Sequence, residues 1–493
     1  MQATVMTATI RGVDALTVEV QADVTSGLPM FGIVGLGDAA VLEARERVRS
    51  AIRSSGLDFP NARVIINLAP APLRKHGTGF DLPIALAILT ATRQIPEVIT
   101  RGATVVGELG LDGSVRSIPG MLAYAYAAVQ SGFDLLGPSA TRTAAVVVGG
   151  VRCRVIDDMR ALRAGHLESE EPDRLCSFEV STEPDLADVA GHRAAKRALE
   201  IAAAGGHNLL FVGPPGSGKT MLARRLGSIL PRLRDDERMT TALIHSVAGV
   251  DEARSLAGVR PFRTPHHSTS TAGLIGGGSP PRPGEVSLAH NGVLFLDELP
   301  EFGPATLQAL RQPMEDGHVT LVRADGRVTY PADFALIAAM NPCPCGFLGD
   351  PEKSCRCTEP VIDRYNNRIG GPLLDRIDMR IRVDRIDPKR ILAEAHDEES
   401  SAQVAQRVEG AIEFGTCHPS THSLSGASLI SACRLQAQAR STLETLARTV
   451  GLSGRAVTRT LRVARTIADL ARESAVTREH VLEAAGYRLG EPS

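Results

Sequence analysis

Apolar and polar residues alternate in three short stretches near the start of the chain, which is the pattern of half-buried β-strands. These stretches are residues 17–24, 64–68 and 104–108. Residues 39–54 and 82–92 instead carry apolar side chains at helical spacing. The alternation predicts an α/β or α+β domain at the N-terminus.

Further along, an apolar strand at 208–212 leads into a glycine-rich loop and then a helix. This order is the usual start of a doubly wound parallel sheet with helices on both faces. From about Pro388 onward the apolar spacing is helical. It is clearest at 443–450, 454–473 and 477–487, and it indicates a helical lid.

Acidic residues are concentrated between residues 168 and 187, where apolar periodicity is weak, so we expect a linker there. The 493 residues exceed what one hydrophobic core supports. We therefore predict an α/β protein of three domains. They are an α+β domain at 1–167, a parallel-sheet domain at 188–385 and a helical domain at 386–493.

The composition is that of an ordinary globular protein, with 43% hydrophobic and 22% charged residues. Aromatic residues make up 3% and Trp is absent, so an aromatic platform for single-stranded nucleic acid is not evident. The net charge of −2 means that a polyanion would need a local basic surface. The chain has no export signal and no apolar run that could cross a membrane, and we expect a cytoplasmic protein without a membrane partner.

The glycine loop is the most specific motif of the chain. It reads Gly213-Pro214-Pro215-Gly216-Ser217-Gly218-Lys219-Thr220 and fits the pattern G-x-x-x-x-G-K-[ST] between a strand and a helix. In such loops the backbone N–H groups surround the phosphates of ATP, the lysine reaches the β- and γ-phosphates, and the last hydroxyl binds Mg²⁺. We predict that these residues bind ATP and that Thr220 binds Mg²⁺.

A second motif is an apolar strand that ends in Asp297 and Glu298. Asp297 is expected to hold the Mg²⁺ shell, and Glu298 to orient and polarise the attacking water. A further apolar strand, 334–340, ends at Asn341, whose amide could hold the lytic water or the γ-phosphate. An ordinary turn residue is the alternative for Asn341.

The order of these motifs, followed by Leu373-Leu374-Asp375-Arg376-Ile377-Asp378, resembles the AAA+ branch that contains the magnesium-chelatase motor subunits. The resemblance implies that Arg376 is an arginine finger acting on the ATP of a neighbouring subunit, and hence that the chain forms a ring. It also implies a sensor-2 arginine at Arg455 in the helical lid, with Arg459 one turn later as the alternative.

The N-terminal domain resembles the Lon-protease peptidase fold through residues 74–81 and 107–120. The serine of that fold aligns with Gly79 and its lysine with Leu122, so we expect no proteolysis. Nearly the whole chain resembles the ComM/YifB family. This implies a hexameric branch-migration helicase that processes DNA in recombination and natural transformation. The alternatives are a protein remodeller, a magnesium-chelatase-type motor subunit and a nucleotide-gated binding module.

Four cysteines lie close together in a loop rich in glycine, proline and charged residues: Cys343, Cys345, Cys355 and Cys357. Four thiolates on two short turns can close a tetrahedral Zn²⁺ site, and we predict structural zinc there. Reduced cysteines without metal and an iron–sulfur cluster are the alternatives. His266 and His267 could contact phosphate or metal, but we interpret them as exposed loop residues.

Alternating β-branched residues on both sides of Asp325-Gly326 predict a β-hairpin over residues 318–330. In AAA+ helicases that the chain resembles, the hairpin before this strand projects into the pore of the ring. Arg323 and Arg327 flank its tip and are expected to contact DNA phosphates. The alternative is a solvated hairpin with incidental arginines.

Overall fold

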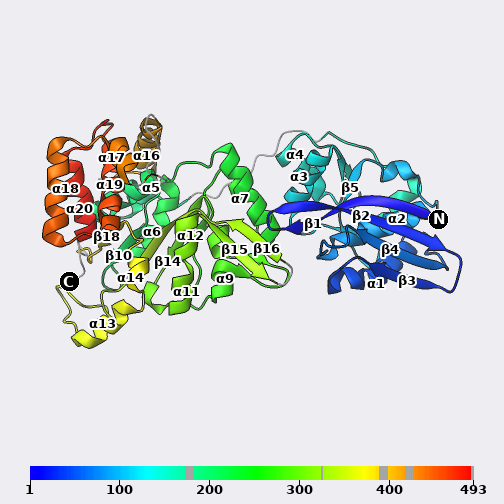
Figure 1. Cartoon of the computed structure of the whole chain (residues 1–493), viewed down its shortest axis with the longest axis horizontal. Coiled ribbons are helices and arrows are strands. Elements are labelled where there is room, and N and C mark those ends of the chain that lie inside the picture. Colours follow the sequence, from blue (N-terminus) through cyan, green and yellow to red (C-terminus); the bar gives the residue numbers. More distant parts are fainter. Residues whose placement is uncertain (172–182, 324–325, 388–397, 417–423, 425, 490–493) are drawn as a thin grey trace.

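The computed structural model of the chain describes residues 1–171, 183–323, 326–387, 398–416, 424 and 426–489. Its three parts lie in a row in chain order, with the parallel-sheet part in the middle and the helical part at the end opposite the N-terminal part (Figure 1). Among these residues, no helix combines the length and the apolar character needed to cross a membrane.

The N-terminal part is built on a seven-stranded mixed sheet in the order β3-β4-β2-β1-β5-β8-β9. Its strands are β1 (Gln2–Arg11), β2 (Asp14–Thr25), β3 (Met30–Val34), β4 (Arg63–Ala69), β5 (Ala103–Val105), β8 (Asp134–Gly137) and β9 (Cys153–Val155). Two short strands, β6 (Glu108–Leu109) and β7 (Val115–Arg116), pair with each other. The helices are α1 (Ala39–Ser54), α2 (Asp81–Ala91), α3 (Met121–Ser131) and α4 (Ala140–Val148).

Burial patterns explain these elements. In β2, Val18, Val20, Ala22 and Val24 are buried, so one face of the strand lies against the core. Helix α1 begins where the carboxylate of its N-cap residue Asp38 accepts a hydrogen bond from the Val41 N–H at 3.0 Å. The predicted segments match β2, α1, β4 and α2, except that 104–108 divides between β5 and β6.

The middle part contains a five-stranded parallel sheet in the order β11-β14-β17-β10-β18. Its strands are β10 (Leu209–Val212), β11 (Phe262–Arg263), β14 (Gly292–Leu296), β17 (Phe334–Met340) and β18 (Met379–Arg382). Strand β10, the first in the chain, therefore lies between the last two. Val212 pairs with Met340, and Leu296 with Ala338, so three strands end at one edge of the sheet. The predicted α/β class is confirmed.

The remaining elements of the middle part surround this sheet. The helices are α5 (Arg193–Gly205), α6 (Lys219–Arg225), α7 (Asp235–Ala248), α8 (Ala253–Leu256), α9 (Thr271–Ile275), α10 (Glu285–Leu288), α11 (Pro304–Ala309), α12 (Arg311–Asp316), α13 (Glu359–Asn367) and α14 (Gly371–Leu374). Two antiparallel pairs complete it: β12 (Gly276–Gly277) with β13 (Arg282–Pro283), and β15 (His318–Arg323) with β16 (Gly326–Pro331).

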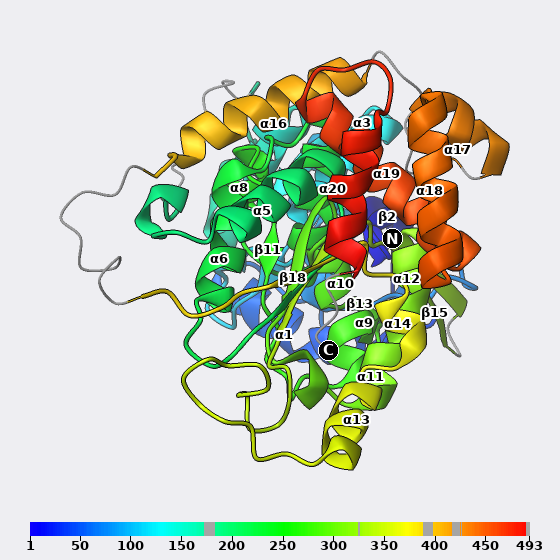
Figure 2. The ribbon, with the colours of Figure 1, turned by 90° about the vertical axis from the view of Figure 1, so that its left-hand side faces the viewer.

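The C-terminal helices pack on one face of the parallel sheet. They are α16 (Ser401–Gly415), α17 (Gly426–Cys433), α18 (Ala437–Val450), α19 (Gly454–Leu470) and α20 (Arg478–Leu489), which Figure 2 shows facing the viewer. Phe211 of β10, Leu199 of α5, Val408 of α16 and Leu461 of α19 belong to one continuous hydrophobic core. Alternate residues of β10, such as Val212, face a second core on the other side of the sheet.

The N-terminal and middle parts are joined by contacts as well as by the chain. Helix α3 packs against α7, where the Gly120 N–H donates to the Ser246 carbonyl oxygen at 2.8 Å. The predicted acidic linker lies partly outside the described residues, and both of its described ends are structured. Glu170 pairs by its backbone with Cys153, and Leu186 is fully buried.

Candidate functional site

The predicted phosphate-binding loop joins β10 to α6 at the edge where the parallel strands end. Gly216 and Gly218 have φ angles of +77° and +88°, in the left-handed region that glycine adopts without steric cost. Gly213 lies so close to the end of β18 that an added Cβ would be 2.0 Å from the Val383 carbonyl oxygen. The glycines thus allow the tight curvature that a phosphate cradle requires.

Lys219, the first residue of α6, is buried within this loop. Its ammonium donates to the carbonyl oxygens of Gly213 at 2.7 Å and Pro214 at 2.8 Å. It also donates to Oδ1 of Asn341, which follows β17, at 3.2 Å. Burial lowers the pKa of Lys219 to about 8, and the carboxylates at the end of β14 act in the opposite direction. The structure thus brings Lys219 and Asn341 together at the loop.

Thr220 and Asp297 meet directly across the loop. The Thr220 hydroxyl donates to Oδ2 of Asp297 at 2.6 Å, and Oδ1 of the same carboxylate accepts from the Glu298 N–H at 2.9 Å. A hydroxyl and a carboxylate at this distance are hard oxygen donors of the kind that Mg²⁺ prefers. The two residues predicted to bind Mg²⁺ therefore lie side by side.

Glu298 has a strained backbone. Its φ of +52° is left-handed, which costs a residue with a Cβ about 1–2 kcal/mol. Such strain concentrates at functional positions. The side chain is 60% exposed and lies close enough to Lys219 to affect its pKa. The carboxylate is therefore accessible to water beside the phosphate-binding loop.

A histidine lies next to this carboxylate. Nδ1 of His267 is 3.7 Å from Oε2 of Glu298, and the rings of His266 and His267 are 4.0 Å apart. His266 is exposed and its Nδ1 lies 2.8 Å from the Ser268 hydroxyl. The interpretation of exposed loop residues fits His266, but it missed the position of His267 at the site.

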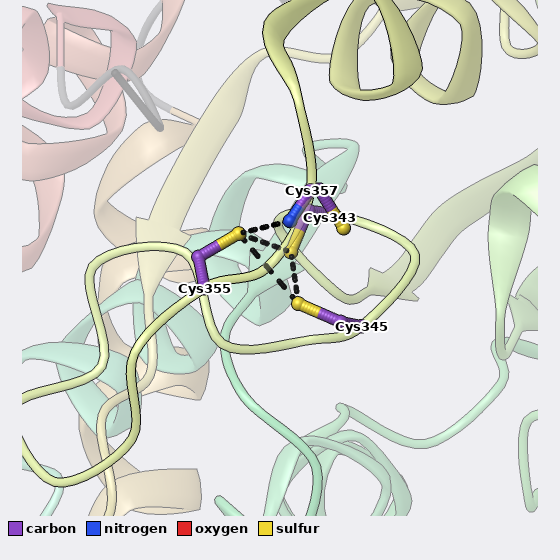
Figure 3. A group of neighbouring side chains, drawn as sticks. All are labelled: Cys343, Cys345, Cys355 and Cys357. Carbon is purple, nitrogen blue, oxygen red and sulfur yellow. Dashed lines mark hydrogen bonds between the residues drawn. The ribbon is translucent and has the colours of Figure 1, made fainter.

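The four clustered cysteines come together with their sulfur atoms within 4.8 Å of one another (Figure 3). The Sγ atom of Cys343 is 3.3 Å from that of Cys345 and 3.7 Å from that of Cys355. The Sγ atoms of Cys345 and Cys355 are 3.6 Å apart. A tetrahedron with Zn–S bonds of about 2.3 Å has edges of about 3.8 Å, so the donor set fits Zn²⁺.

The loop that carries the four cysteines, residues 343–357 and called the cysteine loop below, packs against the phosphate-binding loop. Gly346 has a φ of +82°, and an added Cβ there would be 2.5 Å from Cδ of Pro215. Arg385 contacts the same proline, with its guanidinium 3.4 Å from the Pro215 carbonyl oxygen. Arg385 also pairs with Asp350 at 3.5 Å and Glu352 at 3.3 Å, both in the cysteine loop. Whatever fixes the cysteine loop therefore also supports the nucleotide loop.

Arg376 is only 4% exposed. Its guanidinium pairs with Glu315 and donates to the Pro372 carbonyl oxygen at 2.6 Å, both in the same chain. Its Nε is buried without a hydrogen-bond partner in the described structure. In the single chain Arg376 is thus engaged by groups of its own subunit, and its role as an arginine finger stays a prediction. The Glu315 side chain is 51% exposed, so the pair joins a buried guanidinium to an exposed carboxylate.

The two sensor-2 candidates differ in their surroundings. Arg459 is half-buried and pairs with Asp378 at 3.2 Å. Arg455 is exposed at the start of α19, where Ser453 caps the helix through a hydrogen bond from the Ala456 N–H. Arg459 is thus engaged in an ion pair between sheet and lid, which leaves Arg455 as the accessible residue of the two.

The predicted hairpin corresponds to β15 and β16, and it precedes β17 as expected. Arg323 and Arg327 are both exposed, and Val322 beside them is 70% exposed. Residues 324–325 at the tip lie outside the described part of the chain, so the predicted Asp325-Gly326 turn is described only at Gly326, which has a φ of +114°.

The positions aligned with the Lon dyad cannot perform its chemistry. A Cβ on Gly79 would be 2.5 Å from Cδ1 of Ile118 and 3.3 Å from the Tyr124 hydroxyl, so the space for a nucleophile is filled. Leu122 is 1% exposed and has no amine. These two positions therefore offer neither a hydroxyl nor an amine, and the absence of proteolysis stays a prediction.

One residue that sequence reasoning missed is Asn208, directly before β10. Its side chain accepts from the Leu336 N–H at 2.8 Å and donates to the Arg376 carbonyl oxygen at 3.0 Å. Its backbone N–H donates to Asp378 at 2.9 Å. Asn208 therefore links three strands and the Arg376 segment. Its only sequence signal was a polar residue at the start of a buried strand.

Three family models match the chain. The magnesium chelatase, subunit ChlI model matches residues 185–391, the model for subunit ChlI of Mg-chelatase matches 20–139, and the ChlI C-terminal model matches 398–488. YifB of Escherichia coli is 42% identical over 482 residues, which are 97% of this chain and 95% of YifB. Competence protein ComM of Haemophilus influenzae is 40% identical over 488 residues, with the same coverage of 97% and 95%. The magnesium-chelatase 67 kDa subunit of Chlorobaculum parvum is 30% identical over 159 residues, 31% of this chain and 23% of that protein.

The site geometry predicts different defects for two substitutions. Lys219→Ala should abolish ATP binding because it removes the buried ammonium. Glu298→Gln should bind ATP as the parent does but hydrolyse it about 10²–10⁴-fold more slowly, because only the proton acceptor is lost. A fluorescent ATP analogue measures binding and phosphate release measures turnover. Glu301→Gln, an exposed residue of the same segment, is the control. Undiminished turnover of Glu298→Gln would contradict the assignment.

Proposed function

Because the chain belongs to the ComM/YifB family of magnesium-chelatase-like proteins, we propose that it is an ATP-hydrolysing motor that acts on DNA. One observation carries the ATPase proposal. Lys219, Thr220, Asp297 and Asn341 converge on the glycine loop through direct hydrogen bonds, and Glu298 lies beside them. A nucleotide-gated module without hydrolysis would not require the strained, solvent-accessible Glu298 beside the loop.

The roles of the residues follow from their positions. The loop N–H groups and Lys219 hold the phosphates, and Thr220 and Asp297 are the ligands for Mg²⁺, which would neutralise charge on the β- and γ-phosphate oxygens. Glu298 accepts the proton of the attacking water. Asn341 touches Lys219 and can hydrogen-bond the γ-phosphate, so it orients the phosphate that is cleaved.

DNA is the proposed substrate for two reasons. The relative ComM is named a competence protein, and competence is the capacity of a bacterium to take up DNA. The β15–β16 hairpin also carries two exposed arginines, Arg323 and Arg327, directly before the catalytic strand β17. Guanidinium groups suit phosphate, whereas the scarcity of aromatic residues disfavours base stacking. A branch-migration helicase in recombination or natural transformation fits this combination.

The proposed assembly is a ring, with a hexamer as the form that the family resemblance implies. In a ring, Arg376 would have to leave Glu315 to reach the neighbour's ATP. The exchange would break the ion pair with Glu315 and the hydrogen bond to the Pro372 carbonyl oxygen, and the phosphate charge of the neighbour's ATP would replace them. Protein remodelling or metal insertion would use the same motor parts, but the magnesium-chelatase relative matches less than a third of the chain.

We also propose that the four clustered cysteines bind one structural Zn²⁺. Four protein ligands leave no open position for water, so the role is structural rather than catalytic. The ion would fix a loop that packs on Pro215 through Gly346 and would thereby stabilise the nucleotide loop.

Purified protein is expected to contain about one Zn²⁺ per chain. Replacing Cys345 and Cys355 by Ser should remove the metal and lower the melting temperature, because the loop loses its cross-link. Elemental analysis and thermal unfolding measure the two effects. Cys153→Ser with Cys433→Ser, two buried cysteines outside the cluster, should retain the metal. If protein prepared without chelators contained no zinc, the proposed zinc site would be wrong.

Arg376→Ala is expected to bind ATP but to lose hydrolysis by about 10³-fold or more, as for other arginine fingers. Mixing it with Lys219→Ala subunits should restore part of the hydrolysis at interfaces that combine an intact ATP site with an intact finger. Glu315→Gln, which releases Arg376 without removing it, should retain hydrolysis. Normal turnover by a dilute monomer would contradict the ring.

The DNA proposal predicts that Arg323→Ala with Arg327→Ala leaves basal ATPase unchanged. Stimulation by DNA and strand displacement should fall, and the salt dependence of DNA binding should become shallower, because phosphate contacts are lost. ATPase and four-way-junction unwinding assays measure these effects. A double variant that unwinds junctions as well as the parent would favour a protein-remodelling function.

A further inference from the structure

The turn between β1 and β2 of the N-terminal part packs on the β15–β16 hairpin. A Cβ on Gly12 would lie 3.4 Å from both the Val328 side chain and the Thr329 carbonyl oxygen. Val13, the next residue of the turn, packs against the hydrophobic core that contains Val328 and Leu321. The proposed DNA-binding hairpin is therefore not isolated, because an N-terminal turn braces it.

The same turn adds a charge to the hairpin. The Arg11 guanidinium donates to the carbonyl oxygen of Arg327 at 3.4 Å, and its Nη2 would be 2.5 Å from a Cβ on Gly326. Arg11 is exposed, as are Arg323 and Arg327. The N-terminal part thus contributes an arginine from a segment about 300 residues away in sequence to the group that flanks the hairpin tip.

A fourth arginine belongs to the neighbouring loop. Arg282 is exposed on β13, and the loop before it is held to the hairpin by the Tyr330 hydroxyl, which donates to the Pro281 carbonyl oxygen at 2.9 Å. A Cβ added to Gly277, on the partner strand β12, would lie 3.5 Å from Nη2 of Arg323, so this loop lies beside the hairpin arginine. No carboxylate among the described residues pairs with Arg11, Arg282, Arg323 or Arg327.

We propose that these four arginines, from three segments, form one surface that binds the phosphodiester backbone of nucleic acid, with Arg11 as the contribution of the N-terminal domain. The inference rests on the proposed DNA function and extends it to the N-terminal domain. The chain has a net charge of −2 and hence no global attraction to a polyanion, so nucleic acid would need a local basic surface such as this one. Arginine binds phosphate oxygens in a bidentate manner and carries no sequence preference there.

The test is a titration of the full-length protein with a fluorescent single-stranded oligonucleotide at several salt concentrations. Arg11→Ala should weaken binding and lower the slope of log K against log salt by about one unit, and Arg11→Glu should weaken it further. Arg11→Lys should largely retain the parental affinity and the parental slope, because it keeps the charge. Basal ATPase and the melting temperature should stay at the parental values in all three.

Arg45→Ala is the matched control. Arg45 is exposed on α1 of the same domain and also donates one hydrogen bond to a backbone carbonyl oxygen, that of Leu42 at 3.0 Å. If the parent binds DNA and Arg11→Glu binds it with the same salt dependence, the N-terminal contribution is wrong while the DNA function stands. If Arg11→Lys is as defective as Arg11→Ala, the contact is structural and the proposal is overturned. If the parent binds no DNA, the proposed function fails and this surface with it.

Discussion

The parallel register of β10, β14 and β17 is the constraint on which the site depends. Because these strands end at one edge of the sheet, the residues that follow them are forced together although they are far apart in sequence. The hydrogen bonds from Lys219 to Asn341 and from Thr220 to Asp297 can form only in this register. A slip by one residue would reverse the faces of the strands and separate all four side chains.

Close packing at two glycines is a second constraint on the candidate site. Gly213 lies against the Val383 carbonyl oxygen and Gly346 lies against the Pro215 ring, so the nucleotide loop is closely packed against both the strand end and the cysteine loop. A Cβ at either glycine would push these segments apart. The cysteine loop is therefore part of the wall of the nucleotide site, and the composition of that loop is restricted by its neighbour.

Much of the fold and of the candidate site was predictable from the sequence, because it depends on local patterns. The strand before the glycine loop, helix α1 and the hairpin strands follow from alternation and helical spacing. The motifs also predicted that Lys219, Asp297 and Asn341 each follow a strand, whereas the adjacency of those strands came from the structure. Partners across the fold were not predictable. The burial of Arg376 beside Glu315, the proximity of His267 to Glu298 and the links of Asn208 depend on contacts for which no spacing along one chain gives a signal.

The hydrophobic core that the lid shares with the parallel sheet limits how these two parts can move against each other. Side chains of α16 and α19 interleave with those of α5 and β10, and the Arg459–Asp378 ion pair closes the same boundary. Opening that boundary would expose apolar surface at about 25 cal/mol per Å². Separating lid and sheet within one chain is therefore costly, and in the proposed ring a rotation of whole subunits against their neighbours would expose less of this core.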